Sequence, residues 1–350
     1  MSLNRRHFIR SVSSGLAGIA AGSHFMSASA GAVQAPPTKS RVAFAAGTDR
    51  RDIIAGVLEP FKKEIQAGVR GKQVVIKPNC VWDGNSLCAT DPDAIRAVLD
   101  FLKPIYDRQV IIGESTASPK GTMFTFEEYR YTPIEKEYNA RLVDLNRGTS
   151  TTEWILGENR IPIDIRIIDT FLDPDTYIVS LARMKTHDCV LATLTLKNVI
   201  LASPLNVSKD HPDFVSNQYE KAKMHQGNIH GINYNMYLLA HKVRPKLAVI
   251  DGFVGMEGNG PTRGTPVEHG VALAGFDGVA VDRIGIELMG IRYTDVGYLQ
   301  WCSARGLGQG DREKIEIIGP DIDRHIIRYR MHDNIEWQLK WKDDPKTLKD

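Results

Sequence analysis

Polar side chains follow two short apolar runs of this sequence, at the points where strands would end. Lys77 ends the run Gln73–Lys77, and Asn79 follows it two positions later. Glu114 follows the run Gln109–Gly113. Because ligands of parallel sheets collect at the carboxyl ends of the strands, we expect these side chains to face a shared crevice. A cation, an amide and a carboxylate in that crevice predict binding of a small anionic or carbonyl-bearing substrate.

A second group of candidate residues follows the apolar run Tyr177–Leu181. Lys185 and His187 lie two positions apart, and Lys197 with Asn198 interrupts a later apolar stretch. Burial of an unpaired ammonium group is costly, so Lys197 must either reach water or meet an anion. We predict catalytic roles for the two lysines and a substrate-binding role for Asn198. His187 is the candidate proton shuttle, because a free imidazole has a pKa of about 6.5.

Three acidic residues farther along the chain are candidates for binding a divalent metal or for acid–base catalysis: Asp251, Glu257 and Asp282. Glu257 belongs to a turn in which Gly258 and Gly260 would let the backbone approach a ligand closely, so we assign both glycines to substrate binding. The turn lacks the G-x-G-x-x-G pattern and the Walker Gly-Lys-Ser/Thr ending. This excludes the usual dinucleotide and P-loop sites.

The cysteine spacing argues against an iron–sulfur cluster or a structural zinc site. The four cysteines are Cys80, Cys88, Cys189 and Cys302, and no two of them form a C-x-x-C pair. Cys80 and Cys88 would form a disulfide if their Cα atoms came within about 7 Å, and isolated buried thiols are the alternative. His225 and His230 are one residue too far apart for i,i+4 ligation on a helix, and they match no zincin motif.

The N-terminus has the pattern of a twin-arginine signal peptide. Arg5 and Arg6 precede Phe8, a weakly apolar run covers Ser11–Gly22, and Ala28-Ser29-Ala30 has the small-residue pattern of a cleavage site. The apolar run is too short to span a bilayer as a permanent helix. We therefore expect the Tat export machinery as a partner and a periplasmic or extracellular location.

Length and composition define the class of the remaining chain. Of the 350 residues, 42% are hydrophobic and 25% are charged, which is typical of a globular protein. Removal of residues 1–30, which carry three arginines and no acid, changes the formal net charge from +2 to −1. The body has no long basic cluster, so we expect no nucleic-acid partner. It also has no run of 18 apolar residues, so we expect a soluble protein with no stable membrane span.

The candidate residues lie between elements that alternate along the chain. Predicted strands are Arg41–Ala45, Gln73–Lys77, Gln109–Gly113, Arg141–Leu145, Tyr177–Leu181, Lys246–Asp251, Val271–Ala274 and Lys314–Ile318. Predicted helices are Asp52–Ile65, Pro92–Tyr106, Ile229–Val243 and Gly278–Met289. This alternation predicts an α/β fold, Rossmann-like, with a mostly parallel sheet flanked by helices.

The rest of the chain completes the predicted domain organisation. Residues 146–170 and 203–228 are polar and predict loops, the second long enough for a functional lid. The tail from His325 alternates apolar and polar residues and predicts a C-terminal β-hairpin that turns at Met331–Asn334. We expect the signal peptide at 1–30, a linker at 31–40 and a single α/β domain at 41–350.

The ordered series of motifs resembles the DUF362 family from about Val74 to Gly290. The motifs are Lys77-Pro78-Asn79, Thr90-Asp91-Pro92, Lys185-Thr186-His187, Lys197-Asn198, Asp251-Gly252, Met256-Glu257-Gly258-Asn259-Gly260-Pro261 and Asp277 through Asp282. The resemblance implies no activity, because the family is named for having no assigned function. Some relatives carry ferredoxin-like iron–sulfur modules, which the four scattered cysteines of this chain do not supply.

Three functional hypotheses fit these residues. The first is an exported enzyme, whose hydrolysis, elimination or racemisation chemistry would use the lysines for binding and Asp, Glu or His for metal or acid–base roles. The second is a non-catalytic periplasmic protein that binds a ligand or cofactor with the same lysines. The third treats Asp251, Glu257 and Asp282 as members of a buried ion-pair network with the lysines.

Overall fold

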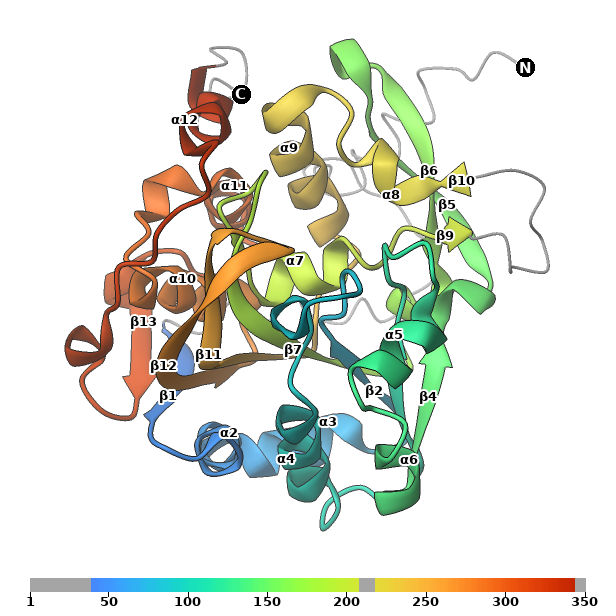
Figure 1. The fold of residues 1–350 in the computed structure, drawn as a ribbon, viewed down its shortest axis with the longest axis vertical. Coiled ribbons are helices and arrows are strands. Elements are labelled where there is room, and N and C mark those ends of the chain that lie inside the picture. The colour runs from blue at the N-terminus through green and yellow to red at the C-terminus, as the bar shows by residue number, and fades with distance from the viewer. Residues whose placement is uncertain (1–38, 208–217, 344–350) are drawn as a thin grey trace, which may run out of the picture. The chain divides into compact units, whose positions relative to one another are not determined.

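A nine-stranded sheet forms the middle layer of the computed structural model, which describes residues 39–207 and 218–343 (Figure 1). The strand order is β13-β1-β12-β11-β7-β2-β3-β4, and the short β8 pairs with β7. The strands are β1 Ser40–Ala46, β2 Gln73–Pro78, β3 Val110–Glu114, β4 Ala140–Asp144, β7 Thr176–Thr186, β8 Ala192–Thr193, β11 Leu247–Asn259, β12 Arg263–Gly275 and β13 Ile315–Ile318. All eight predicted strands are therefore present.

Most neighbouring strands of this sheet are parallel, as predicted. The pairs β11–β7, β7–β2, β2–β3, β3–β4 and β1–β13 are parallel, whereas β12 is antiparallel to both β1 and β11. Every residue of the central strand β7 is buried. Helices cover both faces of a parallel sheet, which is why its strands appear in the sequence as continuous apolar runs.

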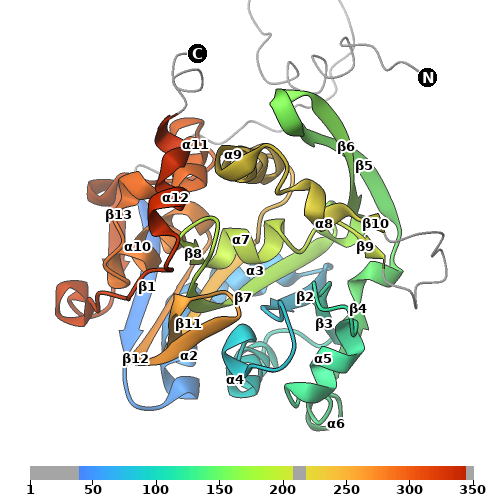
Figure 2. The ribbon, with the colours of Figure 1, turned by 45° about the horizontal axis from the view of Figure 1, so that its top comes forward.

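Two helical layers cover the sheet (Figure 1 and Figure 2). On one face, α2 (Arg50–Leu58), α3 (Lys62–Val69) and α4 (Pro92–Leu102) pack against β2 in one apolar core. On the other face, α7 (Thr195–Ile200), α9 (Asn228–Ala240), α10 (Gly278–Leu288) and α11 (Gly297–Ala304) form a second core. The remaining helices are α5 Thr122–Glu128, α6 Ile134–Glu137, α8 Glu220–Lys223 and α12 Ile335–Leu339.

The segment 146–170, predicted as a loop, instead contains an antiparallel hairpin. Its strands are β5 (Ser150–Leu156) and β6 (Pro162–Ile168), which pair along their whole length. In β6, Ile165 and Ile167 are buried and alternate with polar residues. The overall polarity of the segment concealed this period of two, which is typical of a strand with one buried face.

Only part of the predicted loop 203–228 lies within the described residues. That part contains the short paired strands β9 (Asn206–Val207) and β10 (Gln218–Tyr219), followed by α8. The hypothesis of a lid covers residues 203–228, of which 208–217 lie outside the described residues. The predicted signal peptide and most of the linker also lie outside them.

The prediction of a C-terminal β-hairpin is wrong. No strand follows β13 in the described part of the tail, which ends with α12. The backbone N–H groups of Ile327 and Tyr329 donate instead to the carbonyls of Leu288 and Met289, at the end of α10. The backbone of the tail therefore bonds to the C-terminal end of α10 and not to a second strand. The buried rings of Tyr329 and Trp341 also hold the tail against the core. Its alternating pattern reflects these anchors and not a strand pair.

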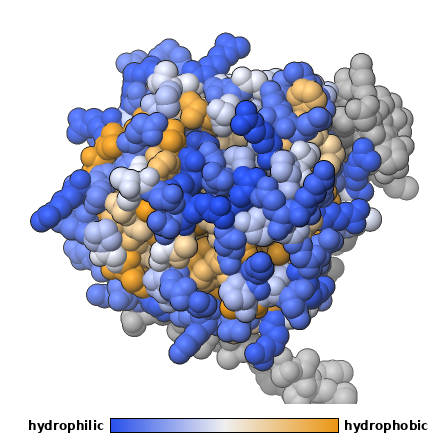
Figure 3. All heavy atoms as spheres, turned by 60° about the horizontal axis from the view of Figure 1, so that its bottom comes forward, coloured by the Kyte–Doolittle hydropathy of each residue, from blue (hydrophilic) through white to orange (hydrophobic). Residues whose placement is uncertain are grey.

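No helix within residues 39–207 and 218–343 is long and apolar enough to cross a membrane. The face drawn in Figure 3 is mostly hydrophilic, with apolar side chains in small groups. Single exposed apolar side chains are normal on globular proteins.

The carboxylate of Asp282, on α10, caps the N-terminus of the short helix α7, which carries Lys197 and Asn198. Its Oδ1 accepts hydrogen bonds from the backbone N–H of Thr195 (2.8 Å) and from Thr195 Oγ1 (2.6 Å), and its Oδ2 accepts one from the N–H of Leu196 (3.0 Å). The first backbone N–H groups of a helix have no partner within the helix, so this carboxyl group satisfies two of them. Complete burial raises the pKa of Asp282 to about 7.

We expect Asp282→Asn to change how stability depends on pH. Asp282 has a raised pKa in the folded protein, so between about pH 4 and pH 7 the folded state binds the proton that the unfolded state has lost. The free energy of unfolding of the wild type should therefore fall over this range, by a few kcal/mol relative to Asp282→Asn. Chemical denaturation at pH 4.5 and 7.5 measures the difference, with the exposed Asp52→Asn as the matched control. Parallel pH profiles for wild type and Asp282→Asn would contradict the expectation.

Candidate functional site

The candidate residues from four strands meet because β2, β3, β7 and β11 are mutually parallel in the sheet. Their carboxyl ends therefore lie at one edge. Lys77 is the partner of Ser180 across the β2–β7 pair, and Asp251 is the partner of Arg183 across the β11–β7 pair. The placement agrees with the general rule that α/β folds bind ligands beyond the carboxyl ends of their strands.

Lys77, Glu114, Asn79 and Asn198, all predicted to bind substrate, form one buried hydrogen-bonded network. Lys77 Nζ donates to Glu114 Oε2 (2.7 Å) and to Asn198 Oδ1 (3.0 Å). Asn79 Nδ2 also donates to Asn198 Oδ1 (3.1 Å), and Asn198 Nδ2 donates to the carbonyl of Lys77 (3.0 Å). This network joins β2, β3 and α7 at the edge of the sheet. The ammonium of Lys77 is paired with a carboxylate, as a buried charge requires.

The hairpin that follows β7 positions the next candidates. β8 pairs with the last two residues of β7, so residues 187–191 form its turn. Leu191 has a positive φ of 64°, which is uncommon for a residue with a branched side chain. Gln338 of α12 closes the turn from outside, since its Nε2 donates to the His187 carbonyl (2.8 Å) and its Oε1 accepts from the Leu191 N–H (2.8 Å).

Three further lysines at this edge, Lys185, Lys197 and Lys221, are not hydrogen-bonded to any carboxylate among the described residues. Lys185 Nζ donates to the carbonyl of Cys88 (2.9 Å) and lies 3.5 Å from that of Pro261. Lys221 Nζ meets Ser115 Oγ and three backbone carbonyls. Lys197, a residue 6% exposed, makes no hydrogen bond to another residue within 39–207 and 218–343, and its Nζ is not among the fully buried polar atoms that lack a partner there.

Burial lowers the pKa values of these three lysines. The pKa falls to about 7 for Lys185 and Lys221 and to about 8 for Lys197. Neighbouring charges act in both directions: Asp188 raises the pKa of Lys197 and Glu114 raises that of Lys221, whereas Lys197 lowers the pKa of Lys185. Lysine residues from α7, α8 and two strands thus share one electropositive region, and an anion would stabilise their charged forms.

His187 lies within this region with two other side chains that bind metals or protons. Burial, reinforced by Lys197, holds the pKa of His187 well below its usual value, so the ring is neutral near pH 7. Its Nδ1 lies 3.0 Å from the backbone N of Cys189 and 3.0 Å from Asp188 Oδ1. Cys189 Sγ lies 3.9 Å from Nδ1 of His225, which follows α8.

The predicted metal ligands Asp251, Glu257 and Asp282 do not come together. Asp282 caps α7 with both carboxylate oxygens. Asp251 is buried, and its Oδ1 lies 3.3 Å from Arg50 Nε, whereas Glu257 Oε2 accepts from the N–H of Arg330 (2.9 Å). Each acid therefore belongs to a different set of contacts. The placement gives no support to a metal site made from these three carboxylates.

The two candidate glycines serve the packing of the β11–β12 hairpin. At Gly260 a Cβ atom would collide with the backbone oxygen of Thr186, and at Gly258 it would collide with the guanidinium of Arg330. Gly258 also has a positive φ of 77°, which strains residues other than glycine. The close approach predicted at these positions is therefore made by protein atoms.

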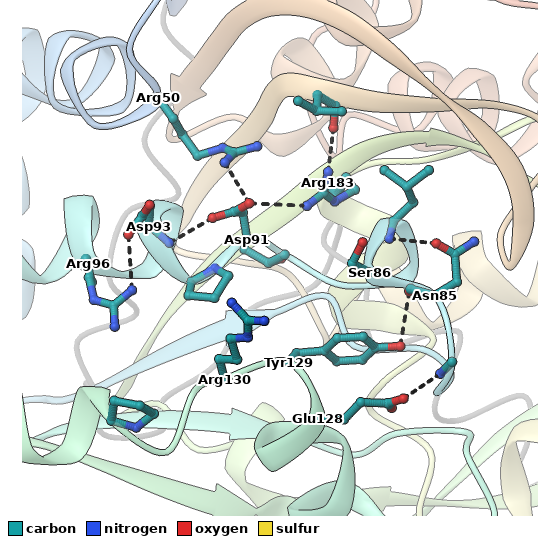
Figure 4. Close-up of a pocket in the computed structure, with 16 residues that line it drawn as sticks. Arg50, Asn85, Ser86, Asp91, Asp93, Arg96, Glu128, Tyr129, Arg130 and Arg183 are labelled. Atoms are coloured by element: carbon teal, nitrogen blue, oxygen red, sulfur yellow. Dashed lines mark hydrogen bonds and ion pairs between the residues drawn. The ribbon is translucent and has the colours of Figure 1, made fainter.

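An open pocket of about 850 Å³ lies at the same edge of the sheet, and its residues were not singled out from the sequence as a pocket (Figure 4). Arg50 and Arg183 flank Asp91, the N-terminal cap of α4, at 2.6 Å and 4.0 Å from its Oδ2. Arg130 also lines the pocket, with an exposed side chain and a positive φ of 61°. The short helix Ser86–Cys88 borders the pocket, and its last carbonyl is the one that holds Lys185. Four arginines face three acids around this pocket, a balance that sequence spacing did not reveal.

All four cysteines are free thiols. Cys80 and Cys88, for which a disulfide and separate thiols were both considered, are both buried. Cys189 is the cysteine that the fold brings beside histidine and aspartate side chains.

The fold and the site define an α/β protein with basic and imidazole groups at the carboxyl edge of a mainly parallel sheet. The chain belongs to the DUF362 family, described as a domain of unknown function, which matches residues 74–287 and confirms the resemblance found in the motifs. It is 24% identical over 232 residues to a thylakoid-associated protein, sll1697, of Synechocystis sp. (strain ATCC 27184 / PCC 6803 / Kazusa). That match covers 63% of this chain and 63% of the relative, so the chain spans less than two thirds of the relative's length.

One solved structure matches part of the chain at low similarity. It is the crystal structure of a protein from Thermotoga maritima, with a TM-score of 0.35 and 10% sequence identity. The match covers 75% of this chain and 60% of the other.

We expect Glu114→Gln to destabilise the protein strongly. The change leaves the buried ammonium of Lys77 without its carboxylate, and breaking a buried ion pair costs about 3–5 kcal/mol. The matched control is Glu137→Gln, which removes a more exposed carboxylate bonded to Arg96 and should cost about 1 kcal/mol or less. Urea denaturation of both variants measures the two costs. Equal losses would show that the Lys77–Glu114 pair is not needed to balance a buried charge.

Proposed function

We propose that the protein is an enzyme that binds a small anionic or carbonyl-bearing substrate beside Lys197 at the carboxyl edge of the sheet. It would act in the periplasm or outside the cell after export by the Tat machinery, as Arg5, Arg6 and the following apolar run indicate. The supporting observation is the excess of buried positive charge around Lys197.

The charges of the neighbouring groups support an anionic ligand. Lys77 has Glu114 as a hydrogen-bond partner, whereas Lys185 and Lys221 bond only to neutral groups among the described residues. Lys197 bonds to none of them, and Asp188 is the carboxylate that acts on it from nearby. Hydrogen bonds from a charged donor to a carboxylate or phosphate are stronger than hydrogen bonds between neutral groups. In a buried site they are strengthened further, because bulk water does not compete for the donor. An oxyanion beside Lys197 would therefore supply the partner that the folded chain leaves out.

The site also reaches the surface, which a substrate requires. Lys197 and His187 are buried, but Asp188 and Cys189 are partly exposed, and the side chain of His225 is exposed. The region therefore meets the surface at the β7–β8 turn and the end of α8.

His187 supplies a group for chemistry beside the bound anion. Its ring is neutral near pH 7 because burial and the adjacent lysines oppose its protonation. A neutral imidazole offers a lone pair that accepts a proton or binds a metal. Hydrolysis, elimination and racemisation each include a proton transfer that such a group can perform, while a lysine holds the anionic part of the substrate.

The experiment measures the binding of inorganic phosphate and of pyruvate, as probes of the two substrate classes, by isothermal titration calorimetry. Lys197→Met should weaken binding of whichever probe the wild type binds by about 10-fold or more, because a hydrogen bond to a charged group contributes about 1.5–3 kcal/mol. Lys242→Met, at a half-exposed lysine paired with Glu153, is the matched control and should not change the affinity. Failure of both probes to bind, or equal affinity in Lys197→Met, would overturn the proposal.

His187→Gln distinguishes an enzyme from a non-catalytic binding protein. The alternative is a non-catalytic binding protein. It is favoured by the backbone carbonyls that already accept hydrogen bonds from Lys185 and Lys221. For an enzyme, we expect wild-type protein to convert a bound α-keto or α-hydroxy acid, or to exchange its α-proton in D₂O, as followed by NMR. His187→Gln should retain the probe affinity within about threefold and lose this turnover. Binding without turnover in the wild type across such acids would identify a binding protein instead.

A further inference from the structure

Three potential metal ligands converge at the turn between β7 and β8, and a fourth lies beside one of them, where sequence spacing gave no sign of a metal site. Within the described residues, His187, Asp188 and Cys189 are the group of three His, Cys, Asp or Glu side chains whose ligand atoms all lie within 4.8 Å of one another. His225 adds a second imidazole, with its Nδ1 3.9 Å from Cys189 Sγ. These residues come from two segments that are 36 positions apart.

From this geometry we infer that His187, Asp188, Cys189 and His225 form a binding site for a divalent transition metal of the zinc type. The inference extends the proposed function to a metal at the same site. Because metal binding is measured without substrate, either proposal can fail alone.

The separations within His187, Asp188 and Cys189 suit joint coordination of one ion, and His225, which lies outside that 4.8 Å group, would join them by a movement of its side chain. For zinc, metal–sulfur bonds of about 2.3 Å and metal–nitrogen bonds of about 2.0–2.1 Å in a tetrahedron place sulfur and nitrogen about 3.6 Å apart. The observed 3.9 Å between Cys189 Sγ and His225 Nδ1 needs only a small closing movement. A thiolate and two imidazoles favour zinc, cobalt, nickel or copper over magnesium or calcium, which prefer oxygen ligands.

The charge balance of the site also suits a divalent ion. Asp188 and a deprotonated Cys189 carry two negative charges, which neutralise the ion, so the nearby Lys197 does not face added positive charge. An exposed His225 and a partly exposed Asp188 provide the entry path that a metal needs.

The turn is held in place by groups outside it, so little ordering is needed on binding. The N–H of His187 donates to the carbonyl of Leu191 (2.9 Å). Asn334 Nδ2 donates to the carbonyl of Asp188 (2.8 Å), and Gln338 Nε2 donates to that of His187 (2.8 Å). Backbone groups of two successive residues, His187 and Asp188, are therefore fixed before a metal arrives, as expected for a preorganised site.

The experiment titrates reduced, metal-free full-length protein with Co²⁺ and then displaces it with Zn²⁺. We expect one equivalent of Co²⁺ to bind, with a thiolate-to-cobalt charge-transfer band in the absorption spectrum, and Zn²⁺ to remove the band. Cys189→Ser should abolish the band and weaken Co²⁺ binding by at least about 10-fold. Cys302→Ala, which removes a buried thiol in α11 instead, is the matched control and should retain both.

His225→Asn provides a test that does not depend on the folding of the buried turn, because this side chain is exposed. It should weaken Co²⁺ binding by at least about 10-fold, whereas His241→Asn, at the end of α9, should leave it unchanged. Absence of stoichiometric Co²⁺ binding in the wild type, a spectrum without the thiolate band, or equal affinity in Cys189→Ser and His225→Asn would overturn the inference.

Discussion

Burial of several ammonium groups at one edge of the sheet is the constraint on which the rest of the site depends. Lys77, Lys185 and Lys197 are almost inaccessible to solvent, and Lys221 lies close enough to interact with two of them. Desolvation of an ammonium group is expensive, so each needs hydrogen-bond acceptors or an anion. Glu114, backbone carbonyls and Ser115 supply part of this need, and Lys197 is left without an acceptor among the described residues.

The parallel sheet makes this concentration of charge attainable. β7 is buried along its whole length, and with 11 residues it is longer than its parallel neighbour β2, which has 6. Its end pairs with β8, and the turn between them presents His187, Asp188 and Cys189 together. α7 then returns across the same edge with Lys197, and Asp282 on α10 fixes its first turn. The site is thus built on strand ends and helix starts, whose backbone positions are well determined.

Much of the fold could be predicted because its signals are local. The apolar runs of β2, β3, β7 and β11 identified a mainly parallel sheet, since strands covered on both faces must be apolar throughout. The same runs placed Lys77, Glu114 and Asn79 at the carboxyl edge, where the structure joins them in one network. The β5–β6 hairpin and the tail were mispredicted, because polar composition concealed one strand pair and isolated anchoring rings imitated another.

The site could be predicted only in part. Residue types and strand ends determined which side chains lie near the carboxyl edge, because the direction of a parallel strand decides where its last residue points. Only the tertiary structure decided which side chains from distant segments meet. Asp282, a candidate for metal binding or acid–base catalysis from the sequence, caps a helix. Cys189 and His225 are 36 positions apart in the sequence, and their side chains lie 3.9 Å apart. The physical reason is that hydrogen bonding and coordination depend on distances of a few ångströms, which arise only when α7, α8 and α12 pack around the end of β7.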